Sequence, residues 1–185
     1  MTDQTLTQIG VRQWALDPSH SEIGFSVKHL MISTVRGNFQ NFSGTAEFDP
    51  EAIENGSINV EIDVASIDTR DENRDGHLRS ADFFDVETYP TMTFRSTNVE
   101  ARGNGSYNVY GELTIKGVSQ PVTLDATFTE VVPDPFGGTR IGVSASTEID
   151  RKQFGFEWNQ VMETGGVLVG EQVGITIDAQ LVINE

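Results

Sequence analysis

The chain has 185 residues, enough for one domain with a sizeable core, and its strand-like segments are spread so evenly that nothing divides it in two. Its formal net charge of −16, from 28 acidic against 12 basic side chains, argues against binding to nucleic acid or to anionic lipid, since both carry negative charge themselves. It contains no cysteine, which excludes disulfides, thiolate catalysis and cysteine-ligated metals.

The N-terminus carries no recognisable targeting signal. Residues 1–8 have neither a basic region nor an apolar run, so they do not form a secretory signal, and the longest apolar runs fall far short of a membrane span. We therefore expect a cytoplasmic protein without stable membrane insertion. Residues 1–11 are predicted to be a flexible tail and residues 12–185 a single domain.

In the first third of the chain, apolar and polar residues alternate, which is the pattern of half-buried antiparallel strands. Asp17-Pro18 should turn the chain. The alternation slips between Phe39 and Phe42, which indicates a β-bulge or a sharp bend at Gln40-Asn41, and Asn55-Gly56 reads as a tight turn. The large apolar positions of these runs are Trp14, Leu16, Ile23, Phe25, Val27, Val35, Phe39, Phe42, Phe48, Ile58, Val60, Ile62 and Val64.

Two irregular stretches rich in aromatic residues interrupt the strands. Residues 77–96 carry Phe83, Phe84 and Tyr89, which are too apolar for a free loop, and the alternation resumes within this stretch at Met92 and Phe94. We expect this insert to cover an open end of the sheet as a lid, and helix to be confined mainly to the two inserts. The second insert, residues 151–170, carries Phe154, Phe156 and Trp158.

The second half of the chain continues the alternation. A turn at Lys116-Gly117 joins two runs into a hairpin, and residues 171–183 form the longest clean alternation. Eight to ten strands with short connections predict an all-β fold, and closure into an antiparallel barrel removes exposed edges. An up-and-down barrel of about eight strands, with a short helical or loop insert closing one end, is therefore predicted. A two-sheet sandwich is the alternative, since alternation does not distinguish a closed sheet from a folded one.

Most predicted strands place a small residue near the middle of the apolar face. In a packed barrel such residues make room for bulky ones opposite, whereas in a hollow barrel they widen the waist. An eight-stranded barrel can hold one small ligand, and the aromatic inserts can close its ends, so we favour a cavity. At about 3.3 Å per residue the last strand spans about 40 Å, which suits an elongated guest. The small residues are Gly44, Ala46, Gly111, Ala126, Ala145 and Ala179.

The sequence lacks the motifs of common enzyme classes: it has no Walker-type phosphate loop, no nucleophile elbow and no His-Glu-x-x-His. We therefore predict no catalytic residue, cofactor or metal. A metal site or general base at His20, with His77 arriving from the lid, is the alternative that the residues leave open. The acidic residues around the lid interleave with Arg70, Arg74 and Arg79, which we expect to pair with them unless one turns inward to meet a polar head group.

Several motifs follow one another from Trp14 to the C-terminal part of the chain. They are Trp14-Ala-Leu-Asp-Pro-Ser-His20, Phe25-Ser-Val-Lys-His29, Val35-Arg-Gly-Asn-Phe39, His77-Leu-Arg-Ser-Ala-Asp-Phe-Phe-Asp-Val-Glu-Thr-Tyr-Pro90, Gly111-Glu-Leu-Thr-Ile-Lys-Gly-Val118 and Asp150-Arg-Lys-Gln-Phe154-Gly155. In this order they resemble the YceI-like family of polyisoprenoid-binding, lipocalin-like proteins. The resemblance implies an elongated eight-stranded barrel, a hydrophobic tunnel for an isoprenoid chain such as a quinone precursor, no established enzymatic activity and a possible homodimer. Many members carry a signal peptide, which this sequence lacks.

Three hypotheses follow. The first is a carrier, store or sequestering protein for a polyisoprenoid or quinone-like lipid. The second is an enzyme acting on a lipophilic substrate with His20 or His77 as acid or base, and the third is a packed barrel that serves in protein association. For the first, the alternation and the inserts predict ligand contacts from Phe25, Val27, Phe39, Phe42, Phe48, Phe83, Phe84, Met92, Phe94, Leu113, Phe128, Phe154, Phe156 and Trp158.

Overall fold

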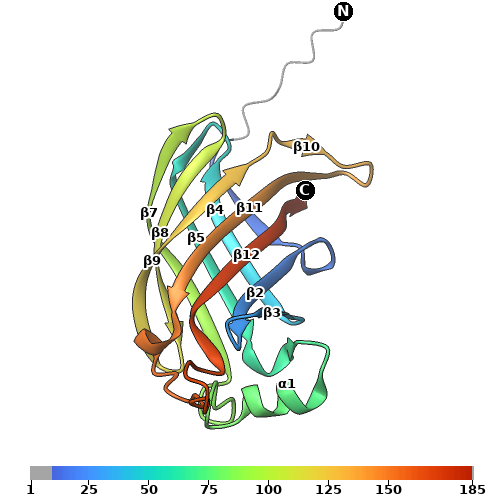
Figure 1. Ribbon diagram of the computed structural model, residues 1–185. Helices are drawn as coiled ribbons and strands as arrows, with labels where there is room; N and C mark the ends of the chain where they lie inside the picture. The colour runs from blue at the N-terminus through green and yellow to red at the C-terminus, as the bar shows by residue number, and fades with distance from the viewer. Residues whose placement is uncertain (1–9, 185) are drawn as a thin grey trace, which may run out of the picture.

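Eight antiparallel strands close into a barrel, shown in Figure 1. The structure is a computed structural model that describes residues 10–184, so most of the tail predicted for residues 1–11 lies outside the described part. Neighbouring strands follow the order β11-β9-β8-β7-β5-β4-β1-β12, and pairing of β11 with β12 closes the ring. The all-β barrel prediction is confirmed, and the sandwich alternative is wrong.

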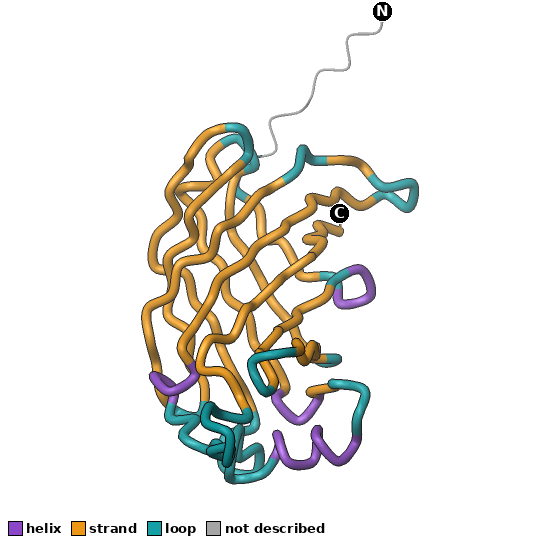
Figure 2. Tube along the Cα trace, viewed as in Figure 1, coloured by secondary structure: helices purple, strands orange, loops and turns teal. Residues whose placement is uncertain are grey.

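Short connections join most of these strands, as predicted, and the two inserts form the long connections from β5 to β7 and from β11 to β12. Their bounds are β1 Arg12–Leu16, β2 Glu22–His29, β3 Ser33–Phe39, β4 Phe42–Asp49, β5 Ala52–Asp63, β7 Thr91–Gly103, β8 Ser106–Ile115, β9 Val118–Phe128, β11 Gly138–Asp150 and β12 Val169–Asn184. Two-residue strands β6 (Ile67–Asp68) and β10 (Val132–Pro133) pair at the margins, and the helices are η1 Pro18–His20, η2 Val64–Ser66, α1 Glu72–Arg79 and η3 Arg151–Phe154. Figure 2 shows α1, η2 and η3 at the lower end, where the barrel would otherwise be open.

The bend predicted at Gln40-Asn41 separates two strands with different neighbours. Before it, β3 pairs with β2 and β6, and after it, β4 pairs with β1 and β5. The turn η1 interrupts the preceding chain in the same way, since β1 and β2 both pair with β12. The first two long strands of the barrel are therefore each built from two pieces, β1 with β2 and β3 with β4.

The turn predicted at Asn55-Gly56 is wrong. The chain turns earlier, at Pro50-Glu51. Asn55 and Gly56 lie inside β5, beside an irregular stretch of the β4–β5 register. Gly56 is needed for a close approach of strands: a Cβ there would lie 2.5 Å from the Cβ of Phe48 and 2.6 Å from the carbonyl oxygen of Glu47. The Asn-Gly pair thus marks a bulge-like irregularity instead of a hairpin.

The lid begins earlier than predicted. Helix α1 starts at Glu72, turns follow to Pro90, and β7 begins at Thr91. The helix has no apolar periodicity, which is why the sequence did not reveal it; polar contacts hold it instead. Asp71 caps it by accepting from the Arg74 amide (3.0 Å), and the buried Asp75 accepts from the amide (2.9 Å) and hydroxyl (2.5 Å) of Thr69.

The lid arginines do not form the expected ion pairs within residues 10–184. Arg74 donates to the hydroxyl and carbonyl oxygens of Thr69, and Arg79 donates to the carbonyl oxygens of Ala65 and Ile67. Both guanidinium groups therefore tie the lid helix to the segment that precedes it, because they donate to backbone carbonyls of that segment.

A charged network fixes η1 against the barrel. Asp17 Oδ2 accepts from Arg140 Nη1 (2.6 Å) and lies 2.9 Å from His20 Nδ1, while Oδ1 accepts from the Ser19 hydroxyl (2.6 Å). The Ser19 hydroxyl, followed by Arg140 and His20, holds the pKa of Asp17 well below its usual value. Because the carboxylate form is favoured in the folded state, this group stabilises the fold above the unfolded pKa of about 3.9, and the contribution is lost on further acidification.

We predict that Asp17→Asn lowers the free energy of unfolding at pH 7 by about 1 kcal/mol, after allowance for solvent screening of this surface network. The difference from wild type should shrink as the pH falls from 7 towards 2. Urea unfolding at several pH values measures it, with the exposed Glu51→Gln as control. A difference that stays constant over this range contradicts the pKa argument.

We also predict opposite effects at two glycines. Gly56→Ala should destabilise the fold by about 1–3 kcal/mol, because its methyl group meets backbone and Cβ atoms that cannot rotate away. Gly76→Ala, in the exposed part of α1 with no atom within 4 Å of the added Cβ, should stabilise by about 0.5–1 kcal/mol through helix propensity. Urea unfolding measures the stability of both variants. A destabilised Gly76→Ala protein would contradict the prediction that an added methyl group on α1 meets no other atom.

Candidate functional site

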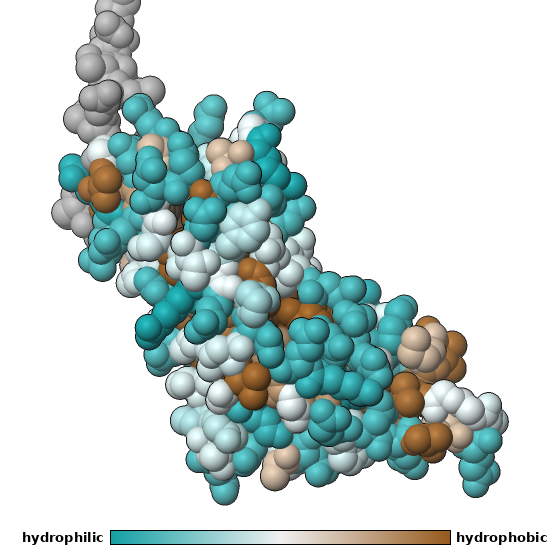
Figure 3. Space-filling view, turned by 90° about the vertical axis from the view of Figure 1, so that its left-hand side faces the viewer, coloured by the Kyte–Doolittle hydropathy of each residue, from teal (hydrophilic) through white to brown (hydrophobic). Residues whose placement is uncertain are grey.

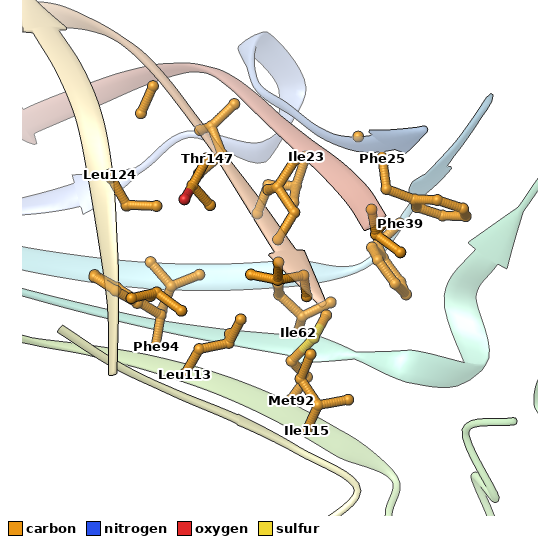
Figure 4. A pocket seen from close by; sticks show the side chains of 18 of the residues that line it. Ile23, Phe25, Phe39, Ile62, Met92, Phe94, Leu113, Ile115, Leu124 and Thr147 are labelled. Carbon is orange, nitrogen blue, oxygen red and sulfur yellow. The ribbon is translucent and has the colours of Figure 1, made fainter. Parts of the chain in front are cut away.

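An apolar cavity lies inside the barrel, as Figure 4 shows for part of its wall. The cavity has a volume of about 220 Å³. All strands of the closed ring except β4 contribute side chains, and so do β2, β3, the lid and η3. Because inward-facing positions alternate along each strand, the same alternation that predicts the strands places apolar side chains on this wall.

Most of the predicted contact residues lie on the cavity wall. In Figure 4, Phe25 and Phe39 lie at one end of the view and Phe94 and Leu113 line the floor. The predicted residues on the wall are Phe25, Val27, Phe39, Phe83, Phe84, Met92, Phe94, Leu113, Phe128, Phe154 and Phe156. Their contact with a ligand stays a prediction.

Three predicted residues are not on the wall. Phe48 is 2% exposed and stacks on Trp14, with ring centroids 5.1 Å apart, so it fills the barrel beyond the cavity. Phe42 packs against the core from β4, the strand that gives nothing to the wall. Trp158 lies on the outer side of the lid, where its ring contacts Phe83 and His77.

Several wall residues were not among the predicted contacts. Strand β12 supplies many of them, including Val173, Ile175 and Ile177. Their alternation was visible in the sequence, but the prediction favoured aromatic residues, which gather at the ends of the barrel and leave aliphatic side chains around its middle. The other omitted apolar residues are Leu16, Ile23, Ile58, Val60, Ile62, Leu78, Val109, Ile115, Val122, Leu124, Val143, Ile149, Val169 and Leu181.

The small residues divide into two groups. Ala126, Ala145 and Ala179 lie on the cavity wall, as the hollow-barrel reading predicts. Gly111 does not widen the cavity, because a Cβ there would lie 2.3 Å from the ring of Phe94. Gly44 and Ala46 also lie off the wall, because Gly44 lies beside Leu16 and Ala46 pairs with Trp14. For Gly44, Ala46 and Gly111, a small residue makes room for a bulky neighbour, as in a packed barrel.

Aromatic clusters lie beyond both ends of the aliphatic wall. In the upper cluster, the rings of Trp14, Phe48, Phe128 and Tyr107 contact one another in sequence, with centroids 5.1–5.9 Å apart. The lower cluster joins strand, lid and second insert, because Phe84 of the lid contacts Phe39 of β3 (6.0 Å) and Phe156 (5.0 Å). The two inserts therefore meet each other over the lower end.

Thr147 and Arg151 are the polar side chains on the wall within residues 10–184. Arg151 is 5% exposed, and its guanidinium donates to the carbonyl oxygens of Gly170 (2.8 Å), Phe156 (2.8 Å) and Trp158 (3.0 Å). Burial lowers the pKa of Arg151. Its guanidinium group thus holds the second insert against β12. Arg151 belongs to the motif from Asp150 to Gly155, but the pattern of residues did not predict that its side chain lies on the wall.

The two histidines of the enzyme hypothesis do not lie on the cavity wall. His20 belongs to the Asp17 network on η1, and its side chain is 57% exposed. His77 lies on α1, at the lower end of the barrel. Its Nε2 atom lies 2.8 Å from Asp82 Oδ2, and its ring packs edge-on to Trp158. Figure 2 shows η1 well above α1, so the two do not form one site. Within the described residues, no three His, Asp or Glu side chains are grouped to hold a metal ion.

Comparison with known proteins identifies the family. A profile described as the YceI-like domain matches residues 14–181, which is most of the chain. The chain belongs to the YceI-like family. A UPF0312 protein of Vibrio cholerae is 40% identical over 139 residues, covering 75% of this chain and 74% of that protein.

Solved structures agree with the YceI-like barrel. The crystal structure of BcnA from Burkholderia cenocepacia is 30% identical, covers 91% of this chain and 99% of its own, and superposes with a TM-score of 0.79. A polyisoprenoid binding domain from Saccharophagus degradans is 16% identical over 91% of this chain and 97% of its own, with a TM-score of 0.66, and therefore shares the fold. In this YceI-like chain, the motif from His77 to Pro90 belongs to the lid, and the motif from Asp150 to Gly155 contains η3 and Arg151.

We predict that Ala145→Phe weakens binding of a long-chain fluorescent hydrocarbon probe about tenfold. Loss of about 60 Å² of guest burial, at about 25 cal/mol per Å², is enough for that change. The exposed Ser146, next along β11, points outward, so Ser146→Phe is the matched control and should bind like wild type. Probe titration of both folded variants provides the measurement, and equal affinities would contradict the cavity assignment.

Proposed function

We propose that this chain binds a long apolar isoprenoid lipid, of the polyprenyl or quinone-like class, inside its barrel as a carrier, a store or a sequestering protein. The observation that carries the proposal is the chemistry of the wall. It offers apolar side chains from nearly every strand, and its one charged group, Arg151, already donates to backbone carbonyls. A guest held there would be selected for apolar surface.

The energetics suit such a guest. Each 100 Å² of apolar surface removed from water contributes about 2.5 kcal/mol, so a flexible hydrocarbon chain needs no ionic anchor. Branched aliphatic side chains such as Val173, Ile175 and Ile177 offer a wall that matches the methyl branches of an isoprenoid. The YceI-like membership supports the same reading, as does the fold shared with the polyisoprenoid binding domain from Saccharophagus degradans.

Binding without turnover is the better-supported reading of this cavity. A general acid or base must reach the reacting atom directly or through one water molecule. His20 and His77 are both engaged with carboxylates away from the wall, and the lining contains no carboxylate of its own. Nothing in the arrangement favours the hydrolytic or redox chemistry that the enzyme hypothesis requires.

The test is native mass spectrometry of the purified chain, followed by solvent extraction and identification of what was bound. We expect one isoprenoid or quinone-like molecule per chain, or stoichiometric uptake when such a lipid is added. The double variant His20→Gln/His77→Gln should retain the same lipid chemically unchanged. An empty wild-type protein that also refuses added polyprenols and quinones would overturn the proposal. A bound lipid that is converted by wild type but not by the histidine variant would favour the enzyme instead.

A further inference from the structure

Three large apolar side chains are exposed together at the lower end of the barrel. Met31 and Ile32, in the turn between β2 and β3, are 64% and 80% exposed, and Val161, in the second insert, is 79% exposed. We call these three residues the apolar tip. Figure 3 shows that apolar residues on another face are mostly scattered among hydrophilic ones, with a few gathered towards the lower end.

Backbone contacts hold the two segments of the tip together. The Leu30 amide donates to the carbonyl oxygen of Leu168 (2.8 Å), and Val161 pairs with Val167 in an isolated β-bridge. Leu30 and Met31 have φ values of 53° and 59°, a left-handed conformation that non-glycine residues seldom adopt. Met31 and Ile32 are thus exposed in a turn whose backbone conformation costs free energy, which is a reason to ask what covers them.

The segments that carry the apolar tip also contribute side chains to the cavity wall. Val27, on the strand that leads into the β2–β3 turn, lines the cavity, and so does Val169, which directly follows Leu168. Phe156, which begins the segment leading to Val161, also lies on the wall. A surface that contacted the tip would therefore touch the same two segments that enclose the lower part of the cavity.

The stretch of chain that forms the β2–β3 turn is basic, although the whole protein is acidic. Residues 23–46 contain no Asp or Glu, although the chain carries 28 such residues in all. The same stretch contains Lys28 and Arg36. Val27 faces the cavity, so its neighbours Ser26 and Lys28 point outward. Arg36 pairs with Ser26 and therefore lies on the same outer face of the hairpin. Neither makes an ion pair with any carboxylate of residues 10–184. The carboxylates on the facing insert are Glu157 and Glu163.

From this arrangement we infer that the apolar tip docks on the surface of a lipid bilayer that contains anionic lipid. Met31, Ile32 and Val161 enter the interface, and Lys28 and Arg36 lie at the level of the head groups. The net charge of −16 argues against such a surface only if charge is evenly spread, and at this hairpin it is not. The inference rests on the proposed function, because a guest with almost no solubility in water must enter and leave the barrel at a membrane.

The loop between β10 and β11 provides a matched control. Phe136 is 93% exposed, more than any residue of the tip, yet it lies at the opposite end of the barrel in Figure 1. It is not on the cavity wall. If exposed apolar surface alone caused attachment, Phe136 would contribute as much as the tip.

The experiment is flotation of the full chain with vesicles of phosphatidylcholine, with and without phosphatidylglycerol, at low and high salt. We expect wild type to bind the vesicles that contain phosphatidylglycerol, and to lose binding as salt rises. Met31→Ser/Ile32→Ser should weaken the partition at least about tenfold. Lys28→Glu/Arg36→Glu should weaken it on the order of fivefold for each charge and remove the salt dependence. Phe136→Ser should bind like wild type.

Three outcomes would overturn the docking surface. The first is that the wild type does not float with vesicles at low salt. The second is that Phe136→Ser and Met31→Ser/Ile32→Ser lose vesicle binding equally. The third is that sedimentation shows a wild-type dimer that dissociates in Met31→Ser/Ile32→Ser, since the tip would then bind a second copy. Extraction of lipid from every variant separates the two proposals. Retained lipid without flotation contradicts docking alone, and flotation of a protein that takes up no lipid contradicts the proposed function alone.

Discussion

The structure depends on the pairing of both edges of β12. One edge forms an uninterrupted ladder with β11, from Gly138–Asn184 to Asp150–Gln172, and the other edge pairs first with β1 and then with β2. A sheet whose first and last strands meet has no free edge along the ring, so its backbone groups are satisfied without help from the interior. The interior is then free to consist of side chains alone, and those side chains are almost entirely apolar.

Closure of the wall leaves the two ends of the barrel to be sealed by other means. The upper end is filled by aromatic rings that belong to the strands themselves, with Trp14 at 0% exposure in the centre. The lower end is covered by the two inserts, and these contain backbone carbonyls that no strand can satisfy. Arg151 donates to the carbonyl oxygen of Phe156 and Arg79 to that of Ala65, so these guanidinium groups satisfy backbone carbonyls that lie outside the strands. The cavity is the space between a solid upper end and a lower end built from separate, hydrogen-bonded pieces.

This asymmetry gives the two ends different roles. The upper rings belong to continuous strands, so they cannot separate without breaking the barrel. The lower cover joins α1, the turns after it and the second insert through aromatic contacts such as Phe84 with Phe156. Exposed apolar residues and unpaired basic residues lie at this same end, on the β2–β3 hairpin and the insert beside it. The proposed membrane docking and the proposed enclosure of an apolar guest therefore involve neighbouring parts of the chain.

The sequence by itself determined most of the strands, the all-β class and much of the wall, because alternation with a period of two places residues such as Phe25, Val27 and Leu113 on one face whatever the partners of each strand. The tertiary structure decided that the sheet closes into a barrel, because closure depends on the pairing of β11 with β12. It misplaced what depends on long-range neighbours. Gly56 and Gly111 are small because Phe48 and Phe94 approach them from adjacent strands, and Phe48 lies beyond the cavity because Trp14 stacks on it. A short helical insert was predicted, but the start of α1 was missed because polar contacts from Asp75 and Arg74 hold this helix instead of an apolar face. Only the tertiary structure decided which arginine lies on the wall, that the histidines lie apart, and that one hairpin carries positive charge beside an exposed apolar tip, since each of these depends on distances between segments that are remote in the chain.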